Sequence, residues 1–173
     1  MMRGFHLVFL ALSTAAVSTV PVPLIIDTDM SSDVDDVAAL CMANALADRK
    51  EVELLAVLHN TGLLEGVGAI SVINHYYGRD HVPIGAFKGT FGSTIPGKYV
   101  PQLAAEFPSP IKNYTEVPDA VEVYRTVLSR QPDQSVTISS IGFLTNLQVR
   151  FIIHPVLSIL PTLYSDPHPP RRY

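Results

Sequence analysis

The apolar and polar residues of this chain follow two alternating patterns, one typical of buried strands and the other of amphipathic helices. Short apolar runs predict four strands covered on both faces, at residues 24–26, 52–58, 82–87 and 135–141. Apolar residues spaced three and four apart predict three helices, at residues 37–46, 63–77 and 120–128. Because strands and helices alternate, we expect an α/β fold with an open, mostly parallel sheet and helices on both faces.

Two segments depart from this alternation. Residues 89–118 are rich in glycine and proline and predict a long loop, a feature that is often functional in compact domains. From residue 148 onward prolines interrupt the apolar pattern, and residues 165–173 predict no regular element. We therefore expect an α/β domain over residues 22–147 and a divergent tail over residues 148–173.

The first residues have the composition of a secretory signal peptide. A positive charge at Arg3 precedes an uncharged stretch over residues 5–20, in which Ala16 and Ser18 are small residues at cleavage-site spacing. We expect cleavage after residue 18 and no stable membrane span afterwards, because the stretch is short and contains hydroxyl side chains. The protein is then secreted or held in the secretory pathway or a lysosome-like compartment. The N-glycosylation sequon at residues 113–115 fits this route.

Composition excludes several classes of protein. A length of 173 residues with 47 % hydrophobic content suits one domain with a core and excludes a disordered chain. A net charge of −4 with scattered basic residues gives no basic face, so we expect no nucleic-acid partner. Cys41 is the single cysteine, which excludes an internal disulfide and a thiolate metal site.

The chemistry of the chain is concentrated directly after the first predicted strand. Five aspartates follow it within ten residues: Asp27, Asp29, Asp33, Asp35 and Asp36. Like charges this close together repel and require a counter-ion, and hard divalent cations bind oxygen ligands. In open parallel sheets, ligands bind beyond the carboxyl ends of the strands. The pattern therefore predicts a cation site at this edge of the sheet.

Other acidic motifs explain the loop less well. An EF-hand starting at Asp27 would need a glycine and a glutamate where the chain has Ser32 and Ala38. A haloacid-dehalogenase-type phosphatase also begins with an apolar strand and Asp-x-Asp, but Ser31 stands where that family has Thr or Val. A solvated loop whose carboxylates cap the next helix, through Asp35 or Asp36, is a further alternative.

Three segments in order carry a resemblance to a known family. Residues 24–40 read LIIDTDMSSDVDDVAAL, residues 56–61 end the second strand with Asn60, and residues 136–147 place a Gly-x-Leu-Thr-Asn turn after the fourth. Together they resemble the inosine/uridine-preferring nucleoside hydrolases. Members of that family are longer chains, and the resemblance covers only their N-terminal half. It therefore implies a nucleoside-hydrolase-like domain that is truncated at its C-terminus.

The resemblance implies a calcium site and its ligands. Asp29 would bind Ca²⁺ and act as the general base on a water held by the metal. Asp36 would bind Ca²⁺ through both oxygens, and Ile141 would contribute its backbone carbonyl. Asp27 would orient the loop from behind these ligands. The longer loop leaves the alignment of Asp33, and so its role, open.

The resemblance also implies a substrate and a reaction. Asp35 and Asn60 would bind the ribose of a small ribonucleoside, and the N-glycosidic bond would be hydrolysed to free base and ribose. Bond breaking of this type passes through an oxocarbenium-like sugar, which carboxylates stabilise. Two other functions remain open at this point. One is a non-catalytic secreted fragment that binds calcium weakly, with a sheet edge open to homo-oligomer formation; the other is the phosphatase.

Overall fold

The computed structural model of the chain describes residues 20–90 and 96–148. Its elements follow in the order β1 (Val22–Thr28), α1 (Asp35–Asp48), β2 (Val52–His59), α2 (Gly66–Tyr76), β3 (Ile84–Ala86), α3 (Val100–Glu106), the 3-10 helix η1 (Tyr114–Glu116), α4 (Ala120–Leu128) and β4 (Thr137–Ser140). The signal peptide predicted over residues 1–18 lies outside the described residues, as does the predicted tail beyond residue 148.

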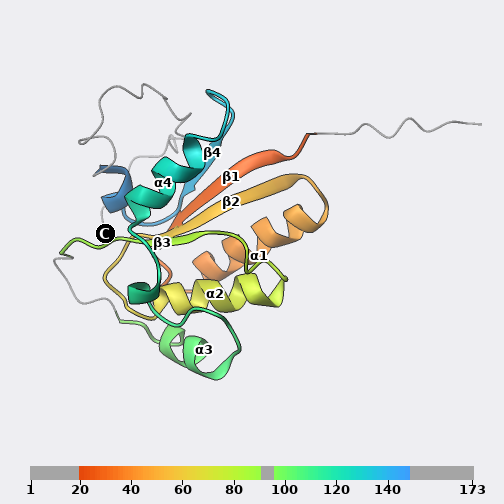
Figure 1. Ribbon diagram of the computed structural model, residues 1–173. Coiled ribbons are helices and arrows are strands. Elements are labelled where there is room, and N and C mark those ends of the chain that lie inside the picture. Colours follow the sequence, from red (N-terminus) through yellow and green to blue (C-terminus); the bar gives the residue numbers. More distant parts are fainter. Residues whose placement is uncertain (1–19, 91–95, 149–173) are drawn as a thin grey trace, which may run out of the picture.

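The four strands form one sheet in the order β3-β2-β1-β4, and every neighbouring pair is parallel (Figure 1). The chain runs outward from β1 through β2 to β3 and then returns to the other side of β1. This return places a topological switch point between β1 and β4. In an open α/β sheet, the crevice at such a point is where ligands bind. The predicted α/β fold with an open parallel sheet is therefore confirmed.

Helices cover both faces of this sheet, with α4 on one side and α1 and α2 on the other (Figure 1). Neighbouring residues of a strand point to opposite faces. Ile25 accordingly packs in the core beneath α4, whereas Ile26 packs in the core beneath α1 and α2. The same alternation directs the next two side chains, Asp27 and Thr28, to opposite faces at the end of β1.

The segment predicted as a loop over residues 89–118 differs from that prediction. It contains helix α3 and the short helix η1. A proline, Pro101, stands in the first turn of α3, where its missing N–H costs no intrahelical hydrogen bond. Val100 and Ala104 are buried on this helix. The loop prediction was therefore wrong over α3, because its proline begins a helix.

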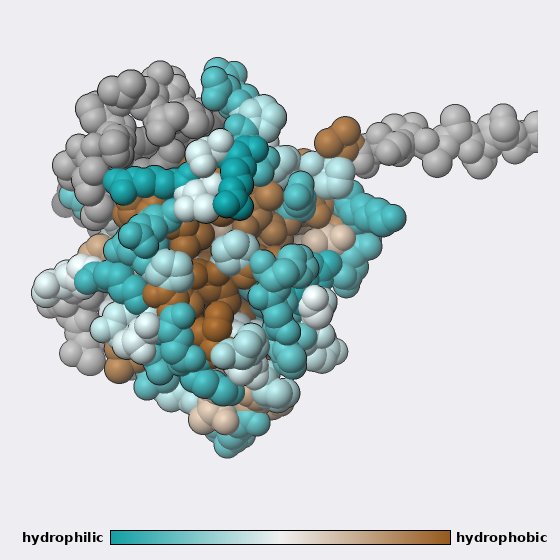
Figure 2. Space-filling view, in the orientation of Figure 1, coloured by the Kyte–Doolittle hydropathy of each residue, from teal (hydrophilic) through white to brown (hydrophobic). Residues whose placement is uncertain are grey.

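The face of the molecule seen in Figure 2 has an apolar region within a polar surround. Figure 2 shows hydrophobic residues in the middle of this face, between α4 and α2, surrounded by hydrophilic ones. Across residues 20–90 and 96–148, no helix combines the length and apolar character needed to cross a membrane.

Candidate functional site

The loop after β1 carries the acidic residues to the switch point of the sheet. Asp35 and Asp36 form the first residues of α1, where unpaired backbone N–H groups and the helix dipole favour negative charge. No side-chain capping bond is present at this helix start. Asp36 instead turns toward β1, and its Oδ1 accepts a hydrogen bond from Thr28 Oγ1 at 2.5 Å. The predicted capping contact is thus replaced by a bond between α1 and β1.

Asp27 lies at the centre of a buried hydrogen-bond network on the α4 side of the sheet. Its Oδ1 accepts from Asn60 Nδ2 at 2.7 Å and from Asn146 Nδ2 at 3.2 Å. Its Oδ2 accepts from Tyr124 Oη at 2.7 Å. Burial raises the pKa of Asp27 to about 6, although these three bonds oppose the rise. The network joins β1, the end of β2, α4 and the turn after β4.

Asp33, Asp35 and Asp36 form a cluster that could hold a metal ion. One carboxylate oxygen from each lies within 4.8 Å of the other two. Asp33 and Asp35 are exposed, whereas Asp36 is buried. Burial raises the pKa of Asp36 to about 6, and the neighbouring charges of Asp29 and Asp35 also raise it. A cluster of hard oxygen donors favours a divalent cation such as Ca²⁺ or Mg²⁺.

Asp29 lies against the turn that follows β4. A Cβ added to Gly142 would lie 2.6 Å from the backbone nitrogen of Asp29 and 2.7 Å from its Oδ1, so a larger side chain would displace Asp29. The backbone N–H of Ile141 donates to the carbonyl of Asp27 at 2.8 Å, which holds this turn against β1. Asp29 also lies near Asp36, because its charge raises the pKa of Asp36. The structure therefore brings Asp29, Asp36 and the Ile141–Gly142 turn together.

The electrostatic surroundings of Asp29 are those of a half-buried carboxylate in an acidic cluster. Burial is the main cause that raises its pKa, and the negative charges of Asp33 and Asp35 raise it further. A bound cation would offset that repulsion.

Asn60 follows β2 and is fully buried. Its Nδ2 donates to Asp27, and its Oδ1 has no hydrogen-bond partner among the described residues. The Oδ1 of Asn146 is likewise unpaired within that part of the chain. Buried polar atoms without a partner are uncommon and call for an explanation. These two amide oxygens fit a site that has acceptor capacity left for a hydroxyl group, a cation or a water.

Two tyrosines outside the predicted site also hold it in place. Tyr99, directly before α3, donates its hydroxyl to the carbonyl of Asp33 at 2.5 Å. Burial raises the pKa of Tyr99 to about 12, with smaller effects from the charges of Asp36 and Asp33. The second tyrosine, Tyr124, is one of the apolar positions that predicted α4, so its polar contact was missed. Its hydroxyl could have indicated that contact, since a buried tyrosine usually finds a hydrogen-bond partner.

His59 is buried and contacts the acidic loop at Met30. Its Nε2 lies 3.3 Å from the carbonyl of Met30 and 3.2 Å from Thr61 Oγ1. Burial lowers the pKa of His59 to about 4, so the ring is neutral at neutral pH. A Cβ on Gly66 would lie 2.2 Å from its Nε2, so the ring fills the space beside α2. This packing points to a structural role.

In comparisons with known proteins, no family model matches the chain and no curated protein matches its sequence.

Proposed function

We propose that this chain is a calcium-dependent hydrolase of the nucleoside-hydrolase type, which cleaves the N-glycosidic bond of ribonucleosides to free base and ribose. One observation supports this most strongly. The three segments that carry the resemblance are far apart in the sequence, yet they meet at the switch point between β1 and β4. Asn60 contacts Asp27, Gly142 contacts Asp29, and both aspartates follow the apolar part of β1.

We assign the calcium ligands to Asp29, Asp36 and the backbone carbonyl of Ile141. The chemistry of these ligands suits the ion, because Ca²⁺ is bound by oxygen atoms and the three residues supply carboxylate and carbonyl oxygens. When bound, calcium would hold sugar hydroxyls and make a neighbouring water more acidic. Asp36 is common to this ligand set and to the cluster with Asp33 and Asp35, so it is the ligand on which the proposal depends most.

The chain's own residues would then divide the remaining tasks. Asp29 would act as the general base that removes a proton from the attacking water. Asp35 is exposed and would accept a hydrogen bond from a ribose hydroxyl. Asn60 uses Nδ2 to bind Asp27, which leaves Oδ1 as the atom that could accept from the sugar. The fixed carboxylates would stabilise positive charge on the sugar ring in the transition state.

Release of free base tests this proposal. The purified chain is incubated with inosine or uridine, with calcium or with a chelator, and the base is measured by chromatography. We expect calcium-dependent release that falls by about 10²–10⁴-fold in Asp29→Asn, the usual contribution of a general base. Asp133→Asn, an exposed aspartate in the loop before β4, is the matched control and should keep full activity. Absence of release from folded, calcium-saturated protein would overturn the catalytic proposal.

The two alternative functions give different results in the same experiment. A non-catalytic calcium binder would show a calcium-dependent rise in melting temperature and no free base. A haloacid-dehalogenase-type phosphatase would need the first aspartate after the strand, Asp27, as its nucleophile. Burial and hydrogen bonds to both oxygens of Asp27 disfavour that chemistry. Hydrolysis of an aryl phosphate with magnesium would restore the phosphatase hypothesis.

A further inference from the structure

The sequon at Asn113 lies away from the acidic site, between α3 and α4. Asn113 is the only asparagine of the sequence with serine or threonine two positions later. Its Oδ1 accepts hydrogen bonds from the backbone N–H of Thr115 at 2.9 Å and from Thr115 Oγ1 at 2.5 Å. Both bonds use the amide oxygen. They leave the amide nitrogen, Nδ2, without a hydrogen bond to the described residues.

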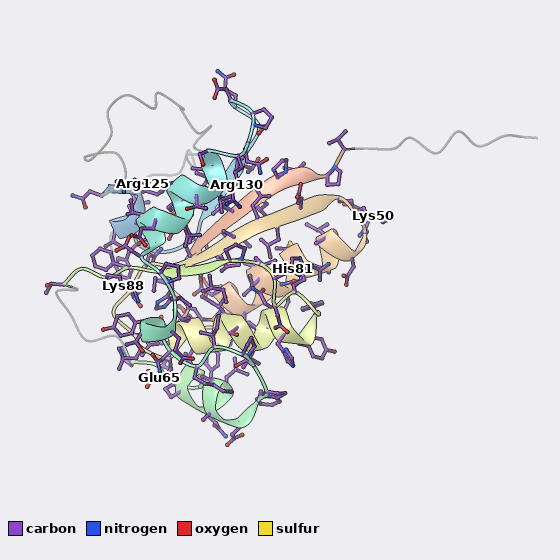
Figure 3. All side chains as sticks on the ribbon, in the orientation of Figure 1. Lys50, Glu65, His81, Lys88, Arg125 and Arg130 are labelled. Atoms are coloured by element: carbon purple, nitrogen blue, oxygen red, sulfur yellow. The ribbon has the colours of Figure 1, made fainter. Side chains whose placement is uncertain are left out.

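The backbone of the sequon is held by contacts that do not involve Nδ2. Glu116 Oε1 accepts from the backbone N–H of Asn113 at 3.1 Å and from that of Lys112 at 3.2 Å. Lys88, which is labelled in Figure 3, donates through Nζ to the carbonyl of Tyr114. The same Nζ lies 4.5 Å from the centre of the Tyr114 ring. A group attached to Nδ2 would therefore break none of these bonds.

A groove beside Asn113 provides room for an attached sugar. It has a volume of about 630 Å³ and lies between the start of α2, helix α3 and the sequon. Its lining combines apolar and polar residues, including Leu64, Glu65, Ala104 and Lys112. Glu65 and Lys88 are labelled in Figure 3 on this side of the molecule. Such a surface can contact both the rings and the hydroxyls of a carbohydrate.

We propose that Asn113 is an N-linked glycosylation site. The donor is a lipid-linked oligosaccharide diphosphate. A bond forms between Nδ2 and C1 of the first sugar, the bond from C1 to the diphosphate oxygen breaks, and Nδ2 loses one proton while the lipid diphosphate leaves. The amide oxygen remains an acceptor, so the bonds to Thr115 persist after attachment. This site is independent of the proposed hydrolase activity and requires only that the chain enters the secretory pathway.

Mass spectrometry of the full chain, expressed from its own N-terminus in insect cells, tests this proposal. We expect peptide N-glycosidase to remove the mass of one glycan from the wild-type chain and to convert Asn113 to aspartate. Thr115→Ser should keep the glycan, because serine also completes a sequon. Asn113→Gln and Thr115→Ala should both lose it. Thr126→Ala, an exposed threonine outside any sequon, is the matched control and should keep it.

The wild-type peptide alone decides the outcome if a variant fails to fold. An unmodified Asn113 in the wild-type chain would overturn the proposal, whether the chain is recovered from the medium or from the cells. Base release from the same preparations is a separate reading, so failure of the glycan proposal and failure of the hydrolase proposal are distinguishable.

Discussion

The acidic loop has a buried half and an exposed half, and the same residue type has a different task in each. Asp27 and Asp36 are buried and accept hydrogen bonds from β1, β2 and α4 neighbours. Asp33 and Asp35 are exposed at the rim. A buried carboxylate that accepts several hydrogen bonds, as Asp27 does, stabilises the fold around it. Asp36 accepts one from Thr28 and keeps its other oxygen for the proposed cation, and the exposed Asp33 and Asp35 can meet a cation or a substrate. Sequence position alone does not separate the two halves.

Asp27→Ala should have the largest effect on stability. It removes the acceptor for Tyr124, Asn60 and Asn146 and leaves buried donors without a partner. We expect a loss of about 3–5 kcal/mol in the free energy of unfolding, measured by urea denaturation. Equal stability of Asp27→Ala and the exposed variant Asp33→Ala would break the distinction between the two halves.

His59 should make the buried half sensitive to acid. Its pKa falls from 6.5 in the unfolded chain to about 4 in the folded chain. Between these values the unfolded chain binds the proton and the folded chain does not, so stability is lost as the pH falls through this window. Integration gives about 3 kcal/mol.

The measurement that checks this is the difference in unfolding free energy between wild type and His59→Gln at pH 7 and pH 4. A difference is needed because Asp27, whose pKa is raised from 3.8 to about 6, gains stability as the pH falls through an overlapping window. His75→Gln, on the exposed surface, is the control. A constant difference across the pH range would show that His59 does not titrate as argued.

Tyr124→Phe should have an intermediate effect. The ring still fills the core beneath α4, but Asp27 Oδ2 loses the hydrogen bond from the hydroxyl. We expect a loss of about 1–2 kcal/mol in the free energy of unfolding. The same substitution at Tyr76, which is 82 % exposed, should change stability by less than about 0.5 kcal/mol. If the two variants lose equal stability, the hydrogen bond from Tyr124 to Asp27 does not contribute to the free energy of unfolding as proposed.

Asp33→Asn should have the smallest effect on stability without calcium. The side chain is exposed, and removal of one charge relieves repulsion within the cluster. We expect a change of less than about 0.5 kcal/mol in thermal or urea unfolding with chelator present. A large loss of unfolding free energy would show that Asp33 belongs with the buried aspartates that stabilise the fold.

The sequence predicts which residues lie at the carboxyl ends of the strands better than it predicts the hydrogen bonds around Asp27. Apolar runs locate β1 and β2, and the acidic loop, Asn60 and the Ile141–Gly142 turn follow strands at positions that parallel pairing brings to one edge. The predicted helix over residues 120–128 coincides with α4. These successes depend on local periodicity and on a general rule for parallel sheets.

The remaining contacts depend on packing between distant segments. Tyr124 binds Asp27 from 97 residues away, and Tyr99 reaches Asp33 from 66 residues away. No spacing rule connects such positions. The bond between Thr28 and Asp36 likewise forms only once α1 folds back onto β1, and it replaces the cap that helix-terminus preferences predicted. Each of these three hydrogen bonds depends on how the helices and strands pack in the folded chain, which local sequence patterns do not predict.

Calorimetric titration of calcium into the purified chain tests the central claim most directly. We expect binding by the wild type, weakening of at least about tenfold in Asp29→Asn and in Asp36→Asn, and no change in the control Asp133→Asn. Loss of binding in Asp33→Asn with full binding in Asp29→Asn would move the ion to the Asp33, Asp35 and Asp36 cluster. Absence of binding by the folded wild type, or wild-type affinity in Asp36→Asn, would contradict a calcium site at this edge of the sheet.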